Sequence, residues 1–221
     1  MLKAVCRHIV SLLGELIGKE KRRHYIWMWE GSLEALRDLK LEQPLVIDIG
    51  CGDGRRIMTY RDCIGKLIGL DIDAKVLTEA KARGIPVIRG DALKLPFKDR
   101  TFDAVTSFHS IEHVTDDLGY LNEIHRVLKK DGDAVIELPN RNRLESKIRE
   151  CVFKKRGYAN HFHYLEYDRP ELEALCRKSN FKQFRIEPIG FISLPGLEMP
   201  WFPRFFSKYC YSYVVTLKAV N

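Results

Sequence analysis

The predicted fold is decided by the stretch Val46-Ile-Asp48-Ile-Gly50-Cys-Gly52-Asp-Gly54-Arg55. Its first half belongs to an apolar run that predicts a buried β-strand, and its second half is a glycine-rich turn. Glycines let the backbone turn tightly and let a ligand approach more closely than a Cβ would permit. A predicted helix follows, so its free backbone N–H groups point back at the turn. Because ligands of open α/β sheets bind at the carboxyl ends of strands, the turn is a candidate binding loop.

The chain around this loop alternates between short apolar runs and helical patterns. Gly, Pro or Asp bound the runs, which cover Leu45–Ile49, Lys66–Leu70, Val87–Ile88, Ala104–Phe108 and Ala134–Leu138. Helical patterns such as Ala74–Arg83 and Leu118–Leu128 lie between them. This alternation predicts βαβ units around a parallel sheet. Continuous apolar runs are typical of strands that are buried on both faces.

Two helical segments, residues 1–18 and 25–40, precede the first strand. We therefore predict a helical extension or lid over residues 1–43 and one domain over residues 44–221. Glu15 interrupts the first apolar run, and a basic cluster follows it where a signal peptide would have its cleavage site. This pattern favours a cytoplasmic location.

The last third of the chain predicts a helix and two strands. The helix covers Arg169–Ser179 and has Pro170 in its first turn, where proline is tolerated. The strand-like runs are Gln183–Ile192 and Tyr209–Ala219. Prolines in the segment Leu194–Phe206 are expected to keep it out of regular structure.

The glycine spacing of the loop separates two classes of ligand. Dinucleotide-binding loops read G-x-G-x-x-G. Here Gly50 and Gly52 fit that pattern, but the next glycine is Gly54, and Arg55 stands where the third glycine belongs. The two aspartates of the stretch would repel a pyrophosphate but suit a cationic amino acid group. The spacing therefore favours a sulfonium nucleoside over NAD.

Carboxylates after the next two strands extend the predicted site. Asp71 lies about 20 residues beyond the first glycine and can accept hydrogen bonds from both ribose hydroxyls. Asp73, two residues later, is better explained as the N-cap of the following helix. Asp91 follows the third strand, where a carboxylate and an adjacent backbone N–H can bind the exocyclic amine and a ring nitrogen of adenine. Its alternative is a residue that only shapes the turn.

This ordered set resembles the class I S-adenosylmethionine-dependent methyltransferases, particularly the small-molecule subgroup of ubiquinone and menaquinone biosynthesis. The resemblance covers about residues 44–140 and rests on Val46–Arg55, Ile68–Asp73, Gly90–Phe97, Phe102–Val105, Ile111–Val114 and Glu123–Gly132. It implies an α/β fold with a Rossmann-like, mostly parallel seven-stranded sheet, an antiparallel last strand and helices on both faces. It also implies S-adenosyl-L-methionine as the cofactor.

Carried over by position, the resemblance assigns cofactor contacts to ten residues. The methionine part would be held by Asp48, Gly50, Cys51, Gly52 and Gly54. The ribose and adenine would be held by Asp71, Ile72, Asp91 and Ala92. The reacting methyl group would lie beside Phe108.

Methyl transfer from a sulfonium is an in-line displacement, so placement of the acceptor supplies most of the catalysis. A phenol or carboxylate needs only desolvation, whereas a hydroxyl needs a general base. His109 is the first candidate for a base, with a polar pocket wall as its alternative. His163 is a second candidate for catalysis or substrate contact, with loop packing as its alternative. Related quinone O-methyltransferases carry a metal-binding E-x-x-E-H segment where this chain reads His109–His113, so no metal site is predicted.

Composition places few bounds on the acceptor. The chain has 221 residues, is 45% hydrophobic and 30% charged, and has no apolar run long enough to span a bilayer. Its six cysteines are scattered, which argues against disulfides and zinc and favours buried thiols. The formal net charge of +7 is concentrated in Lys19–Arg23, Arg141–Arg149 and Lys154–Arg156. Such patches attract RNA, anionic lipid or acidic small molecules, or form solvated faces.

The sequence therefore predicts transfer of a methyl group to an O, N or C atom of a small, partly apolar acceptor. Specificity is expected in residues 1–43, 140–166 and 190–208, which are rich in aromatic residues. One alternative is an RNA or protein methyltransferase that uses the basic patches. Another is a non-catalytic S-adenosylmethionine-binding protein. Peripheral membrane contact through the first helix is compatible with the sequence, which does not determine an oligomeric state.

Overall fold

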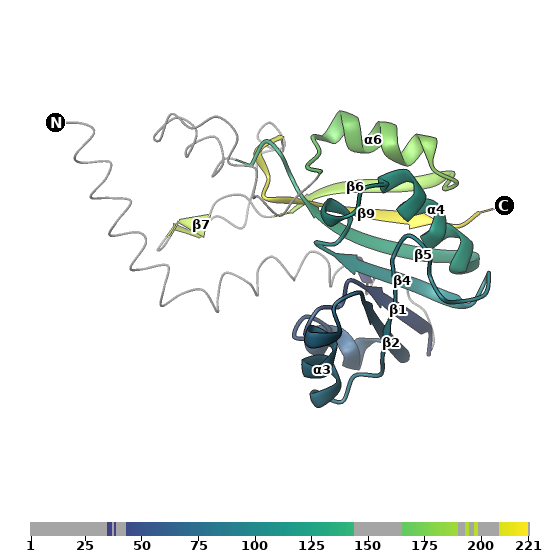
Figure 1. The fold of residues 1–221 in the computed structure, drawn as a ribbon. Helices are drawn as coiled ribbons and strands as arrows, with labels where there is room; N and C mark the ends of the chain where they lie inside the picture. Colours follow the sequence, from purple (N-terminus) through teal and green to yellow (C-terminus); the bar gives the residue numbers. More distant parts are fainter. Residues whose placement is uncertain are drawn as a thin grey trace.

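A seven-stranded sheet in the order β3-β2-β1-β4-β5-β9-β6 forms the centre of the computed structural model (Figure 1). The structure describes residues 35, 36, 38, 43–143, 165–189, 193–194, 197–198 and 208–220. The strands of the sheet are β1 Leu45–Ile49, β2 Lys66–Asp71, β3 Val87–Arg89, β4 Phe102–Phe108, β5 Leu128–Pro139, β6 Gln183–Ile189 and β9 Ser212–Lys218. Only β9 runs antiparallel to its neighbours in this sheet. The predicted Rossmann-like sheet with an antiparallel last strand is confirmed.

Three helices of the described residues begin at an aspartate whose side chain caps them, Asp73, Asp116 or Asp168. The described helices are α2 Ile57–Tyr60, α3 Ala74–Ala82, α4 Asp117–Val127 and α6 Arg169–Lys178, with 3₁₀ turns at Arg61–Cys63 and Ile111–His113. The Asp73 side chain accepts the Lys75 N–H at the start of α3, as predicted. Asp168 and Glu171 form a capping box at the start of α6.

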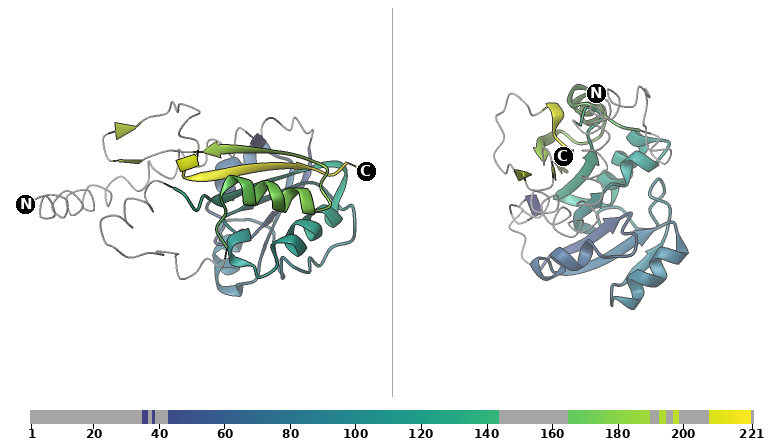
Figure 2. Two further views of the ribbon diagram at one scale, coloured as in Figure 1. Left: turned by 90° about the horizontal axis from the view of Figure 1, so that it is seen from above. Right: turned by 90° about the vertical axis from the view of Figure 1, so that its left-hand side faces the viewer.

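The sheet separates two apolar clusters of side chains. One cluster combines α4 and α6 with Ala134, Ile136 and Leu138 of β5. The other combines α2, α3 and Ala35–Leu36 with Val135, which lies between Ala134 and Ile136 in the same strand. Figure 2 shows α6 beside β6 and β9, and α6 contacts β6. Because side chains alternate across a strand, this division confirms that the central strands are buried on both faces.

Two predicted boundaries are wrong. The predicted strand Ala134–Leu138 is the second half of β5, which already pairs at Leu128 with Phe102 of β4 and continues past a register shift. The segment after Ile192 is not free of regular structure. Ser193–Leu194 and Leu197–Glu198 pair as the short antiparallel strands β7 and β8. Neither strand contains a proline, so backbone pairing is available to both.

The predicted extension over residues 1–43 is described at four positions, of which 35, 36 and 38 are helical. Ala35 and Leu36 are buried. The patches Lys19–Arg23 and Lys154–Arg156 lie outside the described residues. Cys51, Cys176 and Cys210 are buried free thiols, as predicted. Within the described ranges, no helix has both the length and the apolar character needed to cross a bilayer.

Candidate functional site

The glycine-rich loop is fastened to the end of β2 by backbone hydrogen bonds. The N–H groups of Gly50 and Cys51 both donate to the Leu70 carbonyl, at 2.8 and 3.0 Å. The Gly52 N–H donates to Asp71 Oδ2 at 2.9 Å. The other oxygen of Asp71 accepts the N–H of Asp73, also at 2.9 Å. One carboxylate therefore joins the two predicted cofactor motifs.

The three loop glycines have positive φ angles of 74°, 53° and 77° for different reasons. A Cβ at Gly50 would lie 2.4 Å from Ser110 Oγ, and one at Gly54 would lie 2.3 Å from Ile85 Cδ1. Both glycines permit close packing within the protein. A Cβ at Gly52 would meet nothing within 4 Å. Gly52 is therefore the position where the loop borders open space, and the cofactor contact assigned to Gly54 stays a prediction.

The predicted adenine contacts lie on the neighbouring strand ends. The Gly90 N–H donates to the Asp71 carbonyl at 3.0 Å, which brings the start of the loop after β3 next to β2. In that loop, Asp91 Oδ1 accepts the Leu93 N–H at 2.9 Å. The Ile72 side chain is 63% exposed, so its apolar surface is available to a flat ring.

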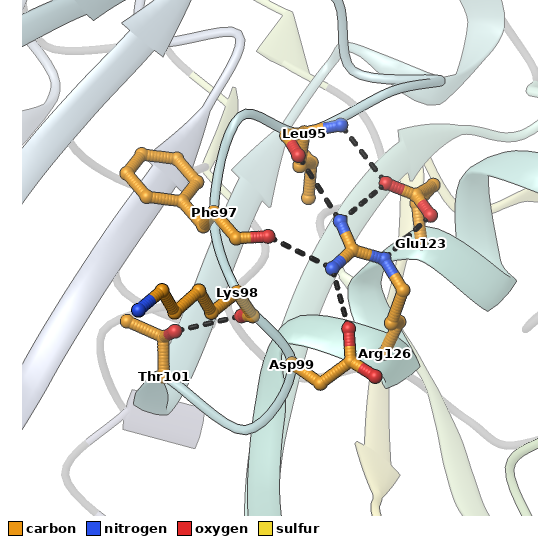
Figure 3. A network of polar contacts seen from close by, with 7 residues as sticks. All are labelled: Leu95, Phe97, Lys98, Asp99, Thr101, Glu123 and Arg126. Atoms are coloured by element: carbon orange, nitrogen blue, oxygen red, sulfur yellow. Dashed lines mark hydrogen bonds and ion pairs between the residues drawn. The ribbon is translucent and has the colours of Figure 1, made fainter.

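Arg126 of α4 holds the loop after β3 in place, as Figure 3 shows. Its guanidinium donates to the carbonyls of Leu95 and Phe97 at 3.0 and 2.8 Å, and to Asp99 at 2.8 Å. It also pairs with Glu123, one turn earlier on the helix, and Glu123 accepts the Leu95 N–H at 2.9 Å. The hydrogen bond from Arg126 lowers the pKa of Glu123. The pair therefore satisfies loop backbone groups that would otherwise lack partners.

We expect Arg126→Met to lower the free energy of unfolding by about 1–3 kcal/mol. The substitution keeps the apolar stem but leaves the Leu95 and Phe97 carbonyls and Glu123 without their donor. Urea unfolding followed by circular dichroism measures the change. Lys130→Met is the control, because Lys130 is an exposed cation just beyond the same helix. Equal unfolding midpoints for the two variants would contradict a structural role of the network.

Asp48 carries a buried carboxylate at the end of β1. The Thr106 hydroxyl donates to it at 2.5 Å, and the Tyr60 hydroxyl lies 3.3 Å from the same Thr106 oxygen. Burial raises the pKa of Asp48 to about 6, although these hydrogen bonds and the charge of Arg56 counteract part of the rise. Asp48 is thus a buried acid that is largely ionised at neutral pH.

The charge of Asp53, the other aspartate of the loop, is paired with arginines of the protein itself. Its carboxylate lies 2.5 Å from the Arg55 guanidinium and 3.4 Å from that of Arg83. Among the ion pairs of the described residues, Asp48 has no corresponding direct partner. Of the two aspartates that the sequence proposed for a cationic group, Asp48 therefore fits that role better.

A charged cluster lies beside this acid at the ends of β4 and β5. The His109 N–H donates to the Glu137 carbonyl at 2.8 Å, and the residue has a positive φ of 53°. Its Nδ1 lies 3.1 Å from Glu112 Oε1, and its Nε2 lies 3.1 Å from Glu137 Oε1. The other Glu137 oxygen pairs with Arg56. The Arg56 guanidinium lies 3.9 Å from the centroid of the Phe108 ring.

The cluster determines the charge of His109. Burial lowers the pKa of its imidazole, but the hydrogen bonds and charges of Glu112 and Glu137 raise it more, to about 9. Near neutral pH the ring is therefore an imidazolium whose two N–H groups point at carboxylates. A general base must be able to accept a proton at the working pH. The geometry thus favours the polar-wall interpretation of His109, and its catalytic role stays a prediction. His163 lies outside the described residues.

Sequence reasoning missed Arg56 and Glu137. Glu137 stands inside the apolar run Ala134–Leu138, which was predicted to be buried on both faces. A charged side chain in such a run needs a partner, because burying an unpaired charge is expensive. That conflict is the signal that would have identified it. Arg56 follows the glycine motif and has no comparable signal in the sequence.

Metal binding and thiolate chemistry find no support in the part of the chain that the structure describes. Those residues contain no group of three or more His, Cys, Asp or Glu side chains arranged to hold a metal ion. Burial raises the pKa of the Cys51 thiol well above its usual range, so this cysteine is not a thiolate.

Comparison with known families identifies the central region. A family profile described as "Methyltransferase domain" matches residues 47–136. The central region of the chain is therefore similar to methyltransferase domains. The matched range contains all of the cofactor residues predicted from the sequence, from Asp48 to Phe108. It also contains three residues of the charged cluster, Arg56, His109 and Glu112. Glu137 follows directly after it.

Two relatives and one solved structure show the extent of the likeness. A protein of Mycolicibacterium smegmatis, named as a probable S-adenosylmethionine-dependent methyltransferase, is 30% identical over 62% of this chain and 51% of its own length. Demethylmenaquinone methyltransferase of Thermotoga maritima is 36% identical over 55% of this chain and 56% of its own length. The chain thus spans about half the length of these relatives. A Thermotoga maritima structure described as a SAM-dependent methyltransferase covers 93% of this chain and 98% of its own, with a TM-score of 0.67. At 21% identity, that structure shows a shared fold.

The residues present fit S-adenosylmethionine, the cofactor predicted from the sequence. Gly52 borders open space where a side chain would intrude, and Asp71 is fixed next to it at the end of β2. Asp48 would supply a buried negative charge for the cofactor's cationic group. Asp71 and Asp91 would hold the ribose and the base. When bound, the cofactor supplies an electrophilic methyl group on a sulfonium.

Proposed function

We propose that this chain is a methyltransferase that uses S-adenosylmethionine and acts on a small-molecule acceptor. The observation that carries the proposal is the open space at Gly52, bordered by Asp71 and backed by the buried acid Asp48. All three residues lie at the carboxyl ends of adjacent parallel strands, where open α/β sheets bind ligands.

The proposed mechanism relies on placement and electrostatics. Asp71 and Asp91 orient the nucleoside, and the charge of Asp48 offsets the positive charge of the donor. Phe108 and the groups around it form the wall against which the acceptor lies. Holding both reactants in line converts a bimolecular displacement into an effectively unimolecular step. Excluding water from this wall strengthens the electrostatic contacts inside it.

Gly52→Ala is expected to weaken the binding of S-adenosylhomocysteine at least tenfold, about 1.4 kcal/mol. The new methyl group would occupy space that the proposal reserves for the cofactor, and isothermal titration calorimetry measures the loss. Gly84→Ala is the matched control. Gly84 also has a positive φ, of 76°, and open space around its missing Cβ, but it lies after α3, outside the site. Each variant should lose about 1 kcal/mol of stability through backbone strain. Equal affinities in the two variants would contradict binding at Gly52.

Turnover is tested with methyl-labelled S-adenosylmethionine and three acceptor pools: small aromatic and aliphatic molecules, total RNA, and protein. The proposal expects label only in the small-molecule pool. Tight binding of S-adenosylhomocysteine without label in any pool would instead indicate a non-catalytic binding protein. Label confined to RNA or protein would favour a macromolecular acceptor.

Two observations support a small acceptor over RNA. The relative from Thermotoga maritima is named for demethylmenaquinone, a small molecule, which agrees with the predicted apolar acceptor. The described arginines of the patch Arg141–Arg149 are also engaged inside the protein. Arg141 pairs with Glu171 at 2.7 Å, and Arg143 pairs with Glu166 at 3.0 Å. Surface cations paired in this way contribute less to phosphate binding than unpaired ones.

A further inference from the structure

The cluster of Arg56, Glu137, His109 and Glu112, here called the charged wall, has its charges arranged in two layers. The carboxylates of Glu112 and Glu137 have 0% side-chain exposure. The side chains of the two cations reach the surface: that of His109 is 29% exposed and that of Arg56 is 16% exposed. The net charge of the cluster is zero when His109 is protonated. Nevertheless, the atoms that a ligand can touch belong to the cations.

The charged wall lies against the loop that is proposed to hold the methyl donor. Ser110, the residue after His109, packs closely on Gly50. A Cβ added at Gly50 would lie 2.7 Å from the Cβ of Ser110. On the other side, Arg56 follows the glycine motif and stacks on Phe108, the last residue of β4. Glu137 joins the two cations. The wall therefore connects the donor loop with the end of β4, where the acceptor has to lie.

We propose that the charged wall recognises the methyl acceptor and selects molecules that present an ionised oxygen, such as a carboxylate, a phenolate or an enolate. This inference rests on the proposed methyltransferase function. Cations whose countercharges are fully buried behind them offer a ligand a positive surface without leaving uncompensated charge in the protein. Both charged side chains are also fixed by the wall, so little order has to be gained on binding.

One feature of the wall opposes this choice. Glu112 Oε2 is buried and has no hydrogen-bond partner among the described residues, so it would attract an ammonium group. The same carboxylate has no exposed surface, and its other oxygen lies 3.1 Å from the partly exposed His109 ring. An acceptor meets the His109 ring before it can reach Glu112. Accessibility therefore favours the anion, and an amine acceptor becomes the competing outcome of the test.

The proposed step needs no protein base. An ionised acceptor oxygen donates an electron pair to the methyl carbon, and the C–O bond forms while the C–S bond breaks towards sulfur. The products are a methyl ether or ester and a neutral thioether. A phenol or enol that arrives protonated releases its proton to solvent when it binds beside the cations. This chemistry agrees with an imidazolium at His109, which has no lone pair to offer.

The test measures the affinities of three matched probes for the protein saturated with S-adenosylhomocysteine: 1-naphthoate, 1-naphthylmethanol and 1-naphthylmethylammonium. All three have the same apolar body and differ in charge. At pH 7 the proposal expects naphthoate to bind at least tenfold more tightly than either of the other probes. Tighter binding of the ammonium, or equal or undetectable binding of all three, would overturn the proposal. Failure of S-adenosylhomocysteine to bind would instead refute the proposed function, so the two failures are distinguishable.

Substitutions in the charged wall test whether its cations cause the preference for naphthoate over the alcohol. His109→Gln should lower naphthoate affinity about tenfold more than the affinity for the neutral alcohol, because the amide keeps a hydrogen-bond donor but carries no charge. Arg56→Met provides the same test from the second cation if the first variant does not fold. His125→Gln is the matched control, since His125 lies on α4 against Phe181, remote from the wall. An unchanged ratio of naphthoate to alcohol affinity in both wall variants would contradict the assignment.

Discussion

Asp71→Ala is expected to weaken S-adenosylhomocysteine binding about 100-fold, or ~2.7 kcal/mol. The substitution removes two contributions at once. It deletes the acceptor for the Gly52 and Asp73 N–H groups, which holds the glycine loop against β2. It also deletes the carboxylate proposed to accept the ribose hydroxyls, and hydrogen bonds to charged groups are worth roughly 1.5–3 kcal/mol each. Isothermal titration calorimetry measures the affinity.

Asp73→Ala is the matched control for this loss. Asp73 lies two residues further along the same loop and also accepts a backbone N–H two residues ahead, that of Lys75, at 2.8 Å. Its removal should cost about 1 kcal/mol of stability, as for other N-caps, and change cofactor affinity less than threefold. If the two alanine variants bound S-adenosylhomocysteine equally well, the ribose role of Asp71 would be refuted.

Elements with strong local signals were predictable from the sequence. The strand Leu45–Ile49 was predicted with its observed bounds, because every residue in it except Asp48 is apolar and a glycine turn follows. The helix Ala74–Ala82 was predicted to within one residue because Asp73 supplies its cap. The start of β5 was missed because Lys129 and Lys130 are charged and exposed. They lie in the strand between Leu128 and Asp133, which pair with β4 on either side of a register shift. Such pairing depends on tertiary contacts that local patterns do not contain.

In the candidate site, too, the sequence could locate the contiguous motifs but not the residues that only the fold brings together. Motifs that bind a ligand through the backbone, such as Gly50–Gly54 and the acids after β2 and β3, are short and contiguous, so sequence could locate them. The charged wall joins positions 56, 109, 112 and 137, which come together only when β4 and β5 pair. Sequence reasoning named His109 as a candidate base because it follows the fourth strand, next to the expected position of the reacting methyl group. Two buried carboxylates keep its imidazole charged, and only the fold brings both of them to one ring.

Asp48→Asn is expected to stabilise the protein and to weaken cofactor binding in the same variant. The pKa of Asp48 rises from a usual value of 3.8 to about 6 on folding, so the ionised side chain opposes folding by ~3 kcal/mol. Asparagine keeps the shape and the oxygen that accepts the Thr106 hydroxyl but loses the charge. Because the new amide is still a buried polar group, we expect a net gain of about 1–2 kcal/mol in urea unfolding at pH 7.5. The affinity for S-adenosylmethionine should fall at least tenfold, since its cationic groups lose their countercharge.

The pH dependence separates this electrostatic account from a packing effect. An acid whose folded pKa is raised destabilises the protein fully above that pKa, and the penalty disappears as the pH falls from about 6 towards 3.8. The stability advantage of Asp48→Asn should therefore shrink over this range. Cofactor affinity of the unmodified protein should also fall below pH 6, as Asp48 becomes neutral, whereas the variant should lack that slope.

Asp133→Asn controls for the loss of a buried carboxylate in general. Asp133 lies on β5, is also buried, and has a pKa that burial raises, but its partner is Lys218 at 3.5 Å and it lies outside the site. Removing it should leave cofactor affinity unchanged. If Asp48→Asn gained no stability, or bound the cofactor as tightly as Asp133→Asn, then Asp48 would not be a charge retained for binding. A buried carboxylate kept at a cost to stability is what a site for a cationic ligand requires, because the ligand supplies the missing countercharge.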